Sequence, residues 1–249
     1  MTALVQAEIR KLRTIRVAIV LLGALVALVG LSVVGTIATA GSEEGTFSLD
    51  TTEGVRNVFG AGFSGAVLVL VLGILGIGSE FRHGTITPVF LVTPRRHRVV
   101  TAKLVAYFAT GLAFGTVGIV VTLLIAVPWL AAKDVSYSLG SDVLAVFAGS
   151  LLATALYGVL GVGVGALIRN QAAAITVAVV WTFVVEGILV GFLPEVGRWV
   201  PGGAATALAG GSSTGGDLLP PWAGGLLLAA YGIGLAALGA RFVVRRDIT

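Results

Sequence analysis

Six long apolar segments, separated by short polar ones, divide the chain. Each has roughly 20 residues or more, the length that a helix needs to cross the hydrocarbon core of a membrane. They are residues 17–38, 58–79, 102–127, 143–168, 172–193 and 222–244. Stretches such as "VAIVLLGALVALVGLSVVG" are apolar in both registers, unlike the alternating strands of a membrane β-barrel. The pattern therefore predicts an all-α integral membrane protein with six transmembrane helices.

A shorter amphipathic segment, residues 1–16, precedes the first span. One helical face carries the apolar side chains of Val5, Ile9, Leu12 and Ile15, and the polar residues Gln6, Arg10, Lys11 and Arg13 lie away from it. Such a helix lies in the membrane interface with its basic side toward anionic lipid headgroups. A cleaved signal peptide is the alternative, because "ATA" at 38–40 resembles a cleavage site. The apolar run at 17–38 exceeds the roughly 7–15 residues of a signal peptide, which favours a retained span.

Composition and charge narrow the function classes. Hydrophobic residues make up 57% of the chain and charged residues 11%, whereas soluble domains average about 25% charged. The chain has no cysteine, and its two histidines lack ligand partners, so we expect no metal site. The basic pI of 9.9 does not indicate nucleic acid as a partner, because the basic residues flank membrane spans.

The basic residues also indicate the orientation. Of the 16 lysines and arginines, only Arg56, Lys133 and Arg198 fall on one side of the predicted spans. The other side carries Arg10, Lys11, Arg13, Arg16, Arg82, Arg95, Arg96, Arg98, Lys103, Arg169, Arg241, Arg245 and Arg246. The positive-inside rule makes that side cytoplasmic. We therefore expect a multi-pass protein of the plasma membrane with both termini in the cytoplasm.

Motifs for chemistry are lacking in this sequence. None of the three lysines follows a glycine, so there is no phosphate-binding loop for ATP and Mg²⁺, and we expect no cofactor in this chain. "GAGFSG" at 60–65 matches a nucleotide-binding pattern, but no strand precedes it. "GSSTG" at 211–215 matches a nucleophile pattern, but the only histidines, His83 and His97, are predicted on the opposite side of the membrane. The first is typical of close helix packing and the second of a linker. We predict no catalytic residue and no enzymatic activity in this chain.

Glycines spaced four apart occur in two spans, at Gly111 and Gly115 and at Gly161 and Gly165. This spacing indicates close helix packing, either within one chain or between two.

Glu186 is the one acidic residue well inside a predicted span. An ionisable group at that depth costs at least about 2.5 kcal/mol unless it faces protein or water, so its side chain should point inward. Two interpretations remain open: a substrate or gating contact, with Phe63 and Trp181 as further candidates for the substrate path, or a structural hydrogen bond between helices. An intramembrane enzyme that uses Glu186 is a third interpretation.

Two segments outside the spans carry unusual patterns. Residues 80–101 begin with "EFRHGTITPVFLVTPRRHR", in which Pro88 and Pro94 forbid a long helix. We expect a short helix along the membrane surface, a turn and a basic anchor. Residues 194–221 contain "GGAATALAG", which is too weakly apolar to cross a membrane but suited to a re-entrant segment at the outer interface.

These features together resemble the ABC type-2 permeases, the membrane subunits of a class of ATP-binding-cassette exporters. The matching features are six spans and three motifs: Glu8, Arg10 and Lys11; Glu80, Arg82, Gly84, Thr85, Ile86, Thr93, Pro94, Arg98 and Lys103; and Leu193, Pro194, Trp199, Pro201 and Ala204. The resemblance covers the whole chain and implies a fold like that of type V ABC exporters.

The resemblance also implies a function for each segment. Residues 80–101 would be the cytoplasmic coupling loop, which contacts a separate ATPase subunit through Glu80, Phe81, Arg82, His83, Gly84, Thr85, Ile86, Pro94 and Arg95. Glu80 and Arg82 would form ion pairs with the ATPase or with the interfacial helix. That helix carries Glu8, Arg10, Lys11 and Arg13.

For the assembly, the resemblance implies two ATPase chains, which hold ATP and Mg²⁺, and a second permease copy or paralogue. The complex would export a hydrophobic or amphipathic substrate, with spans two and five lining the path and residues 194–221 gating it. The competing interpretation is a polytopic transporter of another class or a membrane scaffold protein, in which residues 80–103 only set the orientation.

Overall fold

The computed structural model describes residues 2–40, 47–82, 96–135, 137, 140–168, 170–211 and 216–245. This part of the chain forms helices and contains no strand. The helices are α1 (Thr2–Thr14), α2 (Arg16–Thr39), α3 (Thr52–Gly60), the 3-10 turn η1 (Ala61–Gly65), α4 (Ala66–Arg82), α6 (Arg96–Ala132), α7 (Ser141–Leu167), α8 (Gln171–Val180), the π-turn η2 (Trp181–Val185), α9 (Glu186–Phe192), α10 (Pro194–Gly197), α11 (Pro201–Leu208) and α12 (Pro221–Arg245).

Six of the described helices are long and apolar enough to cross a membrane, which confirms the six predicted spans. The second span is the continuous run α3, η1 and α4, and the fifth is the run α8, η2 and α9. Each observed span contains most of its predicted segment, because about 20 consecutive apolar residues determine a spanning helix regardless of what surrounds it.

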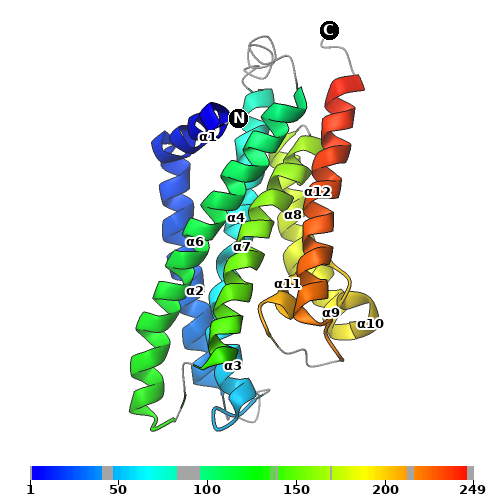
Figure 1. Cartoon of the computed structure of the whole chain (residues 1–249). Coiled ribbons are helices and arrows are strands. Elements are labelled where there is room, and N and C mark those ends of the chain that lie inside the picture. Colours follow the sequence, from blue (N-terminus) through cyan, green and yellow to red (C-terminus); the bar gives the residue numbers. More distant parts are fainter. Residues whose placement is uncertain are drawn as a thin grey trace.

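The spans form one bundle with α1 lying across one end of it (Figure 1). The direction changes at Ile15, whose backbone is extended (φ −82°, ψ 115°) between the end of α1 and the start of α2. The C-terminal end of α12 reaches the same end of the bundle as α1 (Figure 1). An even number of spans requires this arrangement.

The fourth span, α7, lies at the centre, packed against α4, α6 and α12. In the most apolar 18-residue stretch of this span 61% of the residues are buried, whereas the corresponding share in the fifth span is 17%. Close approach depends on the paired glycines: a Cβ at Gly161 would overlap the backbone of Leu70 in α4, and one at Gly111 would overlap the backbone of Ala155 in α7. The glycine spacing therefore serves packing within this chain.

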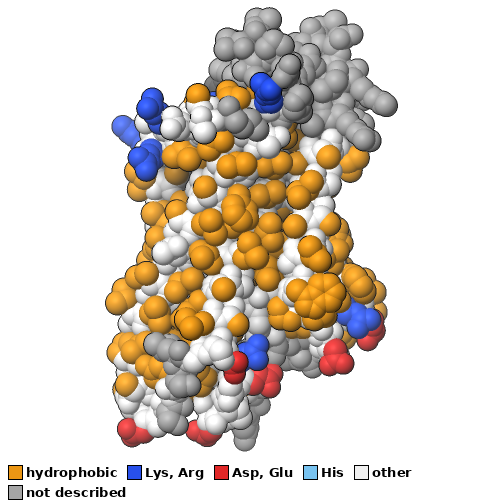
Figure 2. Space-filling view, in the orientation of Figure 1, with side chains coloured by type: hydrophobic (Ala, Val, Ile, Leu, Met, Phe, Trp, Pro, Cys, Tyr) orange, Lys and Arg blue, Asp and Glu red, His pale blue; other side chains and the backbone are white. Residues whose placement is uncertain are grey.

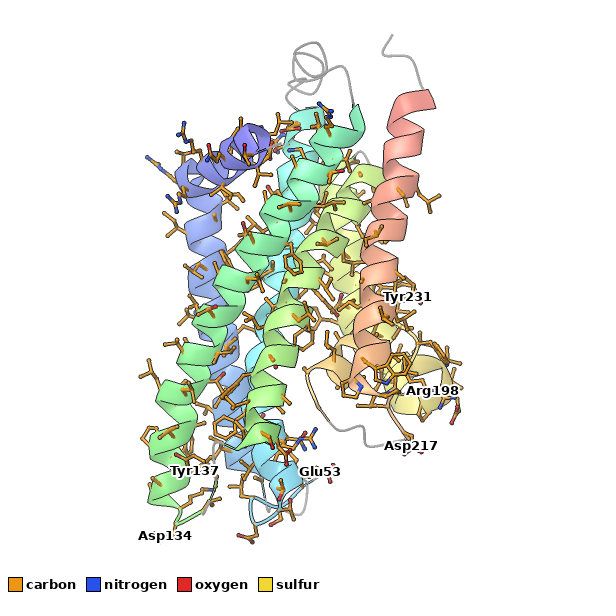
Figure 3. All side chains as sticks on the ribbon, viewed as in Figure 1. Glu53, Asp134, Tyr137, Arg198, Asp217 and Tyr231 are labelled. Atoms are coloured by element: carbon orange, nitrogen blue, oxygen red, sulfur yellow. The ribbon has the colours of Figure 1, made fainter. Side chains whose placement is uncertain are left out.

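The two ends of the bundle differ in charge. Figure 2 shows hydrophobic side chains over the middle of the molecule, lysine and arginine side chains beside α1, and the visible acidic side chains at the other end. Figure 3 places Glu53, Asp134 and Asp217 toward that end. This separation is the one that the sequence predicted from the positive-inside rule.

Helix extends into both ends of the predicted coupling loop at residues 80–101. α4 continues to Arg82, three residues beyond the predicted end of the second span at residue 79, and α6 begins at Arg96, six residues before the predicted start of the third span at residue 102. Hydropathy marks where a helix leaves the apolar layer, but the hydrogen-bonded turns continue into the interface. Residues 83–95 lie outside the described part of the chain.

Candidate functional site

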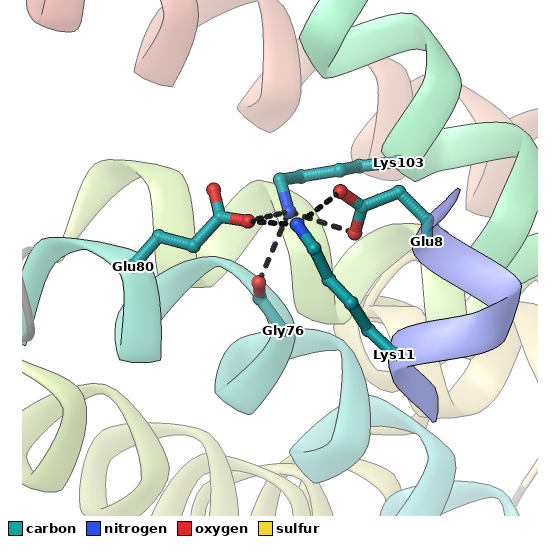
Figure 4. Close-up of polar contacts among 5 residues, drawn as sticks. All are labelled: Glu8, Lys11, Gly76, Glu80 and Lys103. Atoms are coloured by element: carbon teal, nitrogen blue, oxygen red, sulfur yellow. Dashed lines mark hydrogen bonds and ion pairs between the residues drawn. The ribbon is translucent and has the colours of Figure 1, made fainter. Parts of the chain in front are cut away.

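Four charged side chains meet where α1 crosses α4 and α6: Glu8, Lys11, Glu80 and Lys103 (Figure 4). We call them the four-charge cluster. Glu8 and Lys11 come from neighbouring turns of α1, Glu80 from the last turn of α4 and Lys103 from the second turn of α6. The cluster thus joins three elements that are distant in the sequence.

Short ion pairs connect all four residues. The ammonium nitrogen of Lys11 lies 2.9 Å from Glu8 Oε1 and 2.9 Å from Glu80 Oε1. The ammonium nitrogen of Lys103 lies 2.9 Å from Glu8 Oε2 and 2.8 Å from Glu80 Oε1. Two carboxylates therefore face two ammonium groups, and the cluster as a whole carries no net charge.

Lys103 is the centre of the cluster. It is only 1% exposed, and its third donor goes to the backbone carbonyl of Gly76 at 3.2 Å. An ammonium group has three hydrogens to donate, and here each one has an acceptor. A buried charge is tolerated only when it is paired and hydrogen-bonded in this way.

The carboxylates are also buried, since Glu8 and Glu80 are each 7% exposed. Burial alone would raise the pKa of Glu8, but the ammonium groups of Lys103 and Lys11 outweigh it and hold that pKa below its ordinary value. For Lys11, burial would lower the pKa, and the hydrogen bonds to Glu8 and Glu80 instead raise it. Both groups of α1 are thereby held in their charged forms.

One oxygen of the cluster remains unused. Glu80 Oε2 is buried and has no hydrogen-bond partner among the described residues. Arg82, half a turn further along α4, is exposed. The head of the predicted coupling segment thus combines buried ion pairs with an exposed cation.

The structure assigns different environments to the predicted residues of the coupling loop and the interfacial helix. Glu80 contacts Lys11 of α1, and this interfacial helix is one of the two partners expected for it; its side chain is buried. Lys11, expected on the headgroup side of α1, turns its ammonium into the cluster. Arg10 and Arg13 are exposed. His83, Gly84, Thr85, Ile86, Pro94 and Arg95 lie outside the described residues, as does the side chain of Phe81.

A second buried carboxylate lies at the start of α9, nearer the opposite end of the bundle. Glu186 is 4% exposed, as the cost of placing it against lipid requires. Its Oε1 accepts a hydrogen bond of 2.7 Å from the indole N–H of Trp181, and the backbone N–H of Gly202 also donates to the carboxylate. We call Glu186, Trp181 and Gly202 the Glu186 cluster.

The π-turn explains why Trp181 and Glu186 meet. Residues five apart lie about 140° apart around an α-helix, at 100° per residue, so their side chains would diverge. In η2 the backbone N–H of Glu186 bonds to the carbonyl of Trp181, which widens this turn and lets the two side chains meet. Such wide turns inside helices are frequent at functional sites.

Gly202 belongs to the first turn of α11, where backbone N–H groups have no partner inside the helix. Val200, the residue that caps α11, makes no side-chain hydrogen bond to it. Glu186 supplies an acceptor and a negative charge at this helix N-terminus from another element, in place of a local cap. The carboxylate therefore ties the fifth span to the predicted re-entrant segment.

Phe63, the third predicted path residue, lies elsewhere. Its ring packs edge-on against Tyr157 of α7, with the centroids 5.4 Å apart. Both rings belong to the apolar core that also holds Ala204 and Ala205 of α11. Phe63 thus packs against the same core as the re-entrant segment.

Sequence reasoning missed the burial of Lys103 and the part played by Gly76 and Gly202. The sequence predicted Lys103 as a basic residue at the start of a span. Its pairing with Glu80 was not predicted, although both residues belong to the same family motif. The backbone donor of Gly202 and the backbone acceptor of Gly76 leave no signal in a sequence.

Comparison with known families identifies the chain. The family described as "ABC-2 family transporter protein" matches residues 4–185. No curated protein sequence matches the chain. The matched range holds all four residues of the four-charge cluster and ends one residue before Glu186. Because the match covers more than half of the sequence, the chain belongs to the ABC-2 transporter family, whose members are the membrane component of ABC transporters and not the ATPase.

Proposed function

We propose that the chain is the permease subunit of an ATP-driven exporter, assembled with a second permease copy or paralogue and two ATPase subunits in the plasma membrane. The end that carries the four-charge cluster faces the cytoplasm, where the ATPases bind residues 80–95. Family membership supports this proposal over a scaffold protein or a transporter of another class.

One observation carries the mechanism: the four-charge cluster joins the two helices that flank residues 83–95. α4 ends at Arg82, two residues after Glu80, and α6 begins at Arg96, seven residues before Lys103. Lys103 pairs with Glu80 across these two helices, and Lys11 adds α1 to the same unit. Movement of the coupling segment is thereby passed to the second span, the third span and the interfacial helix together.

An exposed cation supports an external partner at this place. Arg82 lies two residues beyond Glu80, at the end of the second span. An ATPase that presents an acidic side chain to this arginine fits the proposal.

At the other end, the Glu186 cluster supports a gating function for the acid. Its carboxylate is already bound by Trp181 and by the backbone of Gly202, so it holds α11 in place and is not an open charge awaiting a cation. The same contacts argue against an intramembrane enzyme that uses Glu186 as a free acid or base. With an apolar interior around it, the exported molecule is hydrophobic or amphipathic.

The test of this mechanism compares two substitutions on α1, one at Lys11 and one at a nearby arginine outside the four-charge cluster. Lys11→Gln removes the ion pair between α1 and Glu80, and because its side chain is 47% exposed the change costs less stability than the loss of buried Lys103 would. In a reconstituted complex with its ATPase, we expect the substrate-stimulated ATP hydrolysis to fall severalfold. Glu80→Ala is a poorer test, because it leaves buried Lys103 with one carboxylate only.

The matched control is Arg13→Gln, which removes the same charge from an exposed position of α1. Stimulation should remain as in the wild type. Equal loss in both variants would point to lipid attraction by α1 as a whole and would contradict the proposed joint, as would normal stimulation in Lys11→Gln.

A further inference from the structure

A cavity of about 150 Å³ opens next to the four-charge cluster, under the corner between α1 and α2. Its walls are mostly apolar: Leu12, Ile15 and Val17 come from the corner, and Leu72 and Leu75 come from α4. Ile15 and Val17 are 41% and 43% exposed, so the cavity meets the surface of the bundle that faces lipid. Of its lining residues only Arg82 also enters the proposed contact with the ATPase, and none belongs to the Glu186 cluster.

The cavity is apolar at one end, beside Leu72, and polar at the other, beside Arg82. Leu72 and Arg82 both line it, and they lie ten residues apart on the α4 helix. At 1.5 Å per residue this distance is about 15 Å along the helix axis. A ligand that fills the cavity therefore has a charged or polar end near Arg82 and an apolar end beside Leu72.

Two polar groups that line the cavity lack partners among the described residues. The guanidinium of Arg82 is exposed and forms no ion pair with another described residue. Gln171, at the start of α8, also lines the cavity, and its Oε1 is buried without a hydrogen-bond partner in the described structure. A complementary ligand presents an anion to the arginine and a hydrogen-bond donor to the amide oxygen.

We propose that this cavity binds one anionic glycerophospholipid with a hydroxyl-bearing headgroup, of which phosphatidylglycerol is the simplest example. The phosphate lies against Arg82, a headgroup hydroxyl donates to Gln171 Oε1, and the first part of one acyl chain fills the space between α1 and α4. An apolar cavity of this volume takes hydrocarbon in preference to water. Arginine binds phosphate through charge-assisted hydrogen bonds.

A lipid fits better than a free phosphate compound, because a free phosphate would leave the apolar walls of Leu72 and Leu75 unfilled. The walls are also fixed: α1 and α4 are held together by the ion pairs of Lys11. The lipid is thus a stably bound lipid between α1 and α4. Its binding does not depend on the proposed transport function, because it involves this chain alone.

The experiment titrates the full chain in detergent with phosphatidylglycerol and, separately, with phosphatidylcholine of the same acyl chains. Native mass spectrometry counts the lipids bound. We expect one phosphatidylglycerol per chain at concentrations where phosphatidylcholine does not bind. Arg82→Gln should weaken phosphatidylglycerol binding about tenfold, as expected for the loss of a hydrogen bond to a charged group. Arg98→Gln, an exposed arginine at the start of α6 that does not line the cavity, should leave it unchanged.

A second variant, Leu75→Trp, fills the apolar part and should abolish binding while Arg82 is intact. Thermal unfolding of each variant checks that it is folded. Equal binding of phosphatidylcholine would overturn the proposal, since the cavity would then be an unselective hydrocarbon crevice. Displacement by glycerol 3-phosphate would show a soluble-anion site, and an equal effect of Arg98→Gln would show diffuse surface charge. Either result would also overturn it.

Discussion

The four-charge cluster and the Glu186 cluster both bury carboxylates, but the first surrounds them with ammonium groups and the second with neutral N–H donors. In the first, Glu8 and Glu80 share two lysines over distances of 2.8–2.9 Å. In the second, Glu186 receives a hydrogen bond from Trp181 and another from the backbone of Gly202. Each cluster joins elements that are distant along the chain.

The difference concerns how each contact is lost. The four-charge cluster has no net charge as long as all four residues are present. Removal of one of them leaves an uncompensated charge in a buried place. A carboxylate held by dipoles loses only hydrogen bonds when it is neutralised. The first arrangement suits a permanent joint between elements that move together, and the second suits a contact that opens.

The largest expected effect is that of Lys103→Met at the centre of the four-charge cluster. Two buried carboxylates would keep only Lys11 as a partner, and breaking a buried pair in this way costs about 3–5 kcal/mol. The measurement is denaturant or thermal unfolding of the purified chain. Lys133→Met is the control, because Lys133 is exposed near the opposite end and should matter little.

Adding Glu80→Gln to Lys103→Met should recover part of the lost stability, because Glu8 and Lys11 then remain as a balanced pair. Strictly additive losses in the double variant would show that these two residues do not interact energetically. If the Lys103→Met protein were as stable as the Lys133→Met protein, the ion pairs would not hold α1, α4 and α6 together, and the proposal that these helices move as one unit would be contradicted.

A smaller effect is expected at Glu186, because neutral donors hold it. Gly202→Ala places a Cβ against Glu186 Oε2, and Glu186→Gln introduces an amide N–H where an acceptor is needed. Each should loosen α11. The chain has no cysteine, so the alkylation rate of a single cysteine at Ala204, which is 0% exposed, reports the opening. We expect it to rise about tenfold, as for the loss of about 1.4 kcal/mol.

The matched control is Gly187→Ala, beside Glu186, since a Cβ at Gly187 has no neighbour within 4 Å. The double variant Glu186→Gln with Gly202→Ala should open α11 no further than the stronger single one, because both break the same contact. Fully additive effects would place the two residues in separate contacts.

The smallest effect is that of pH on the docking of α1. The pKa of Glu8 is lowered, so its contribution is complete above about 4.3, the value in the unfolded chain, and is lost as pH falls through the folded pKa. The pKa of Lys11 is raised, so its contribution is complete below about 10.4 and is lost as pH rises through its folded pKa. Between about pH 5 and 10 the contact of α1 should therefore be constant.

Fluorescence anisotropy of a label on a single cysteine at exposed Ala3 measures the mobility of α1. The label should gain mobility only at the acidic and alkaline extremes. A change between pH 6 and 8 would mean that another titrating group controls the docking of α1.

Much of the fold could be predicted from the sequence because each span is a local property. The six apolar runs all became spanning helices, and the burial of Glu186 followed from the cost of exposing a carboxylate to lipid. The boundaries of the 80–101 segment were predicted less well, since polar residues at a helix end belong equally to helix and loop on composition alone. Helix accounts for residues 80–82 and 96–101.

The contacts of the candidate site could be predicted only in part. Glu80 and Lys103 appear in one motif, but Glu8 and Lys103 are 95 residues apart, and no local pattern joins them. Trp181 and Glu186 were both candidates for the substrate path, yet their hydrogen bond depends on a π-turn. Gly202 contributes through its backbone, which every residue except proline offers equally.

The sequence by itself determined the class of this protein, the number of its spans, the charge difference between its ends and its family. Each of these follows from sums over neighbouring residues or from short motifs, which hold whatever the helices pack against. Only the tertiary structure decided which charges are buried and what neutralises them. Ion pairs such as Lys103 with Glu8 act over about 3 Å, so they exist only after packing has brought α1, α4 and α6 together.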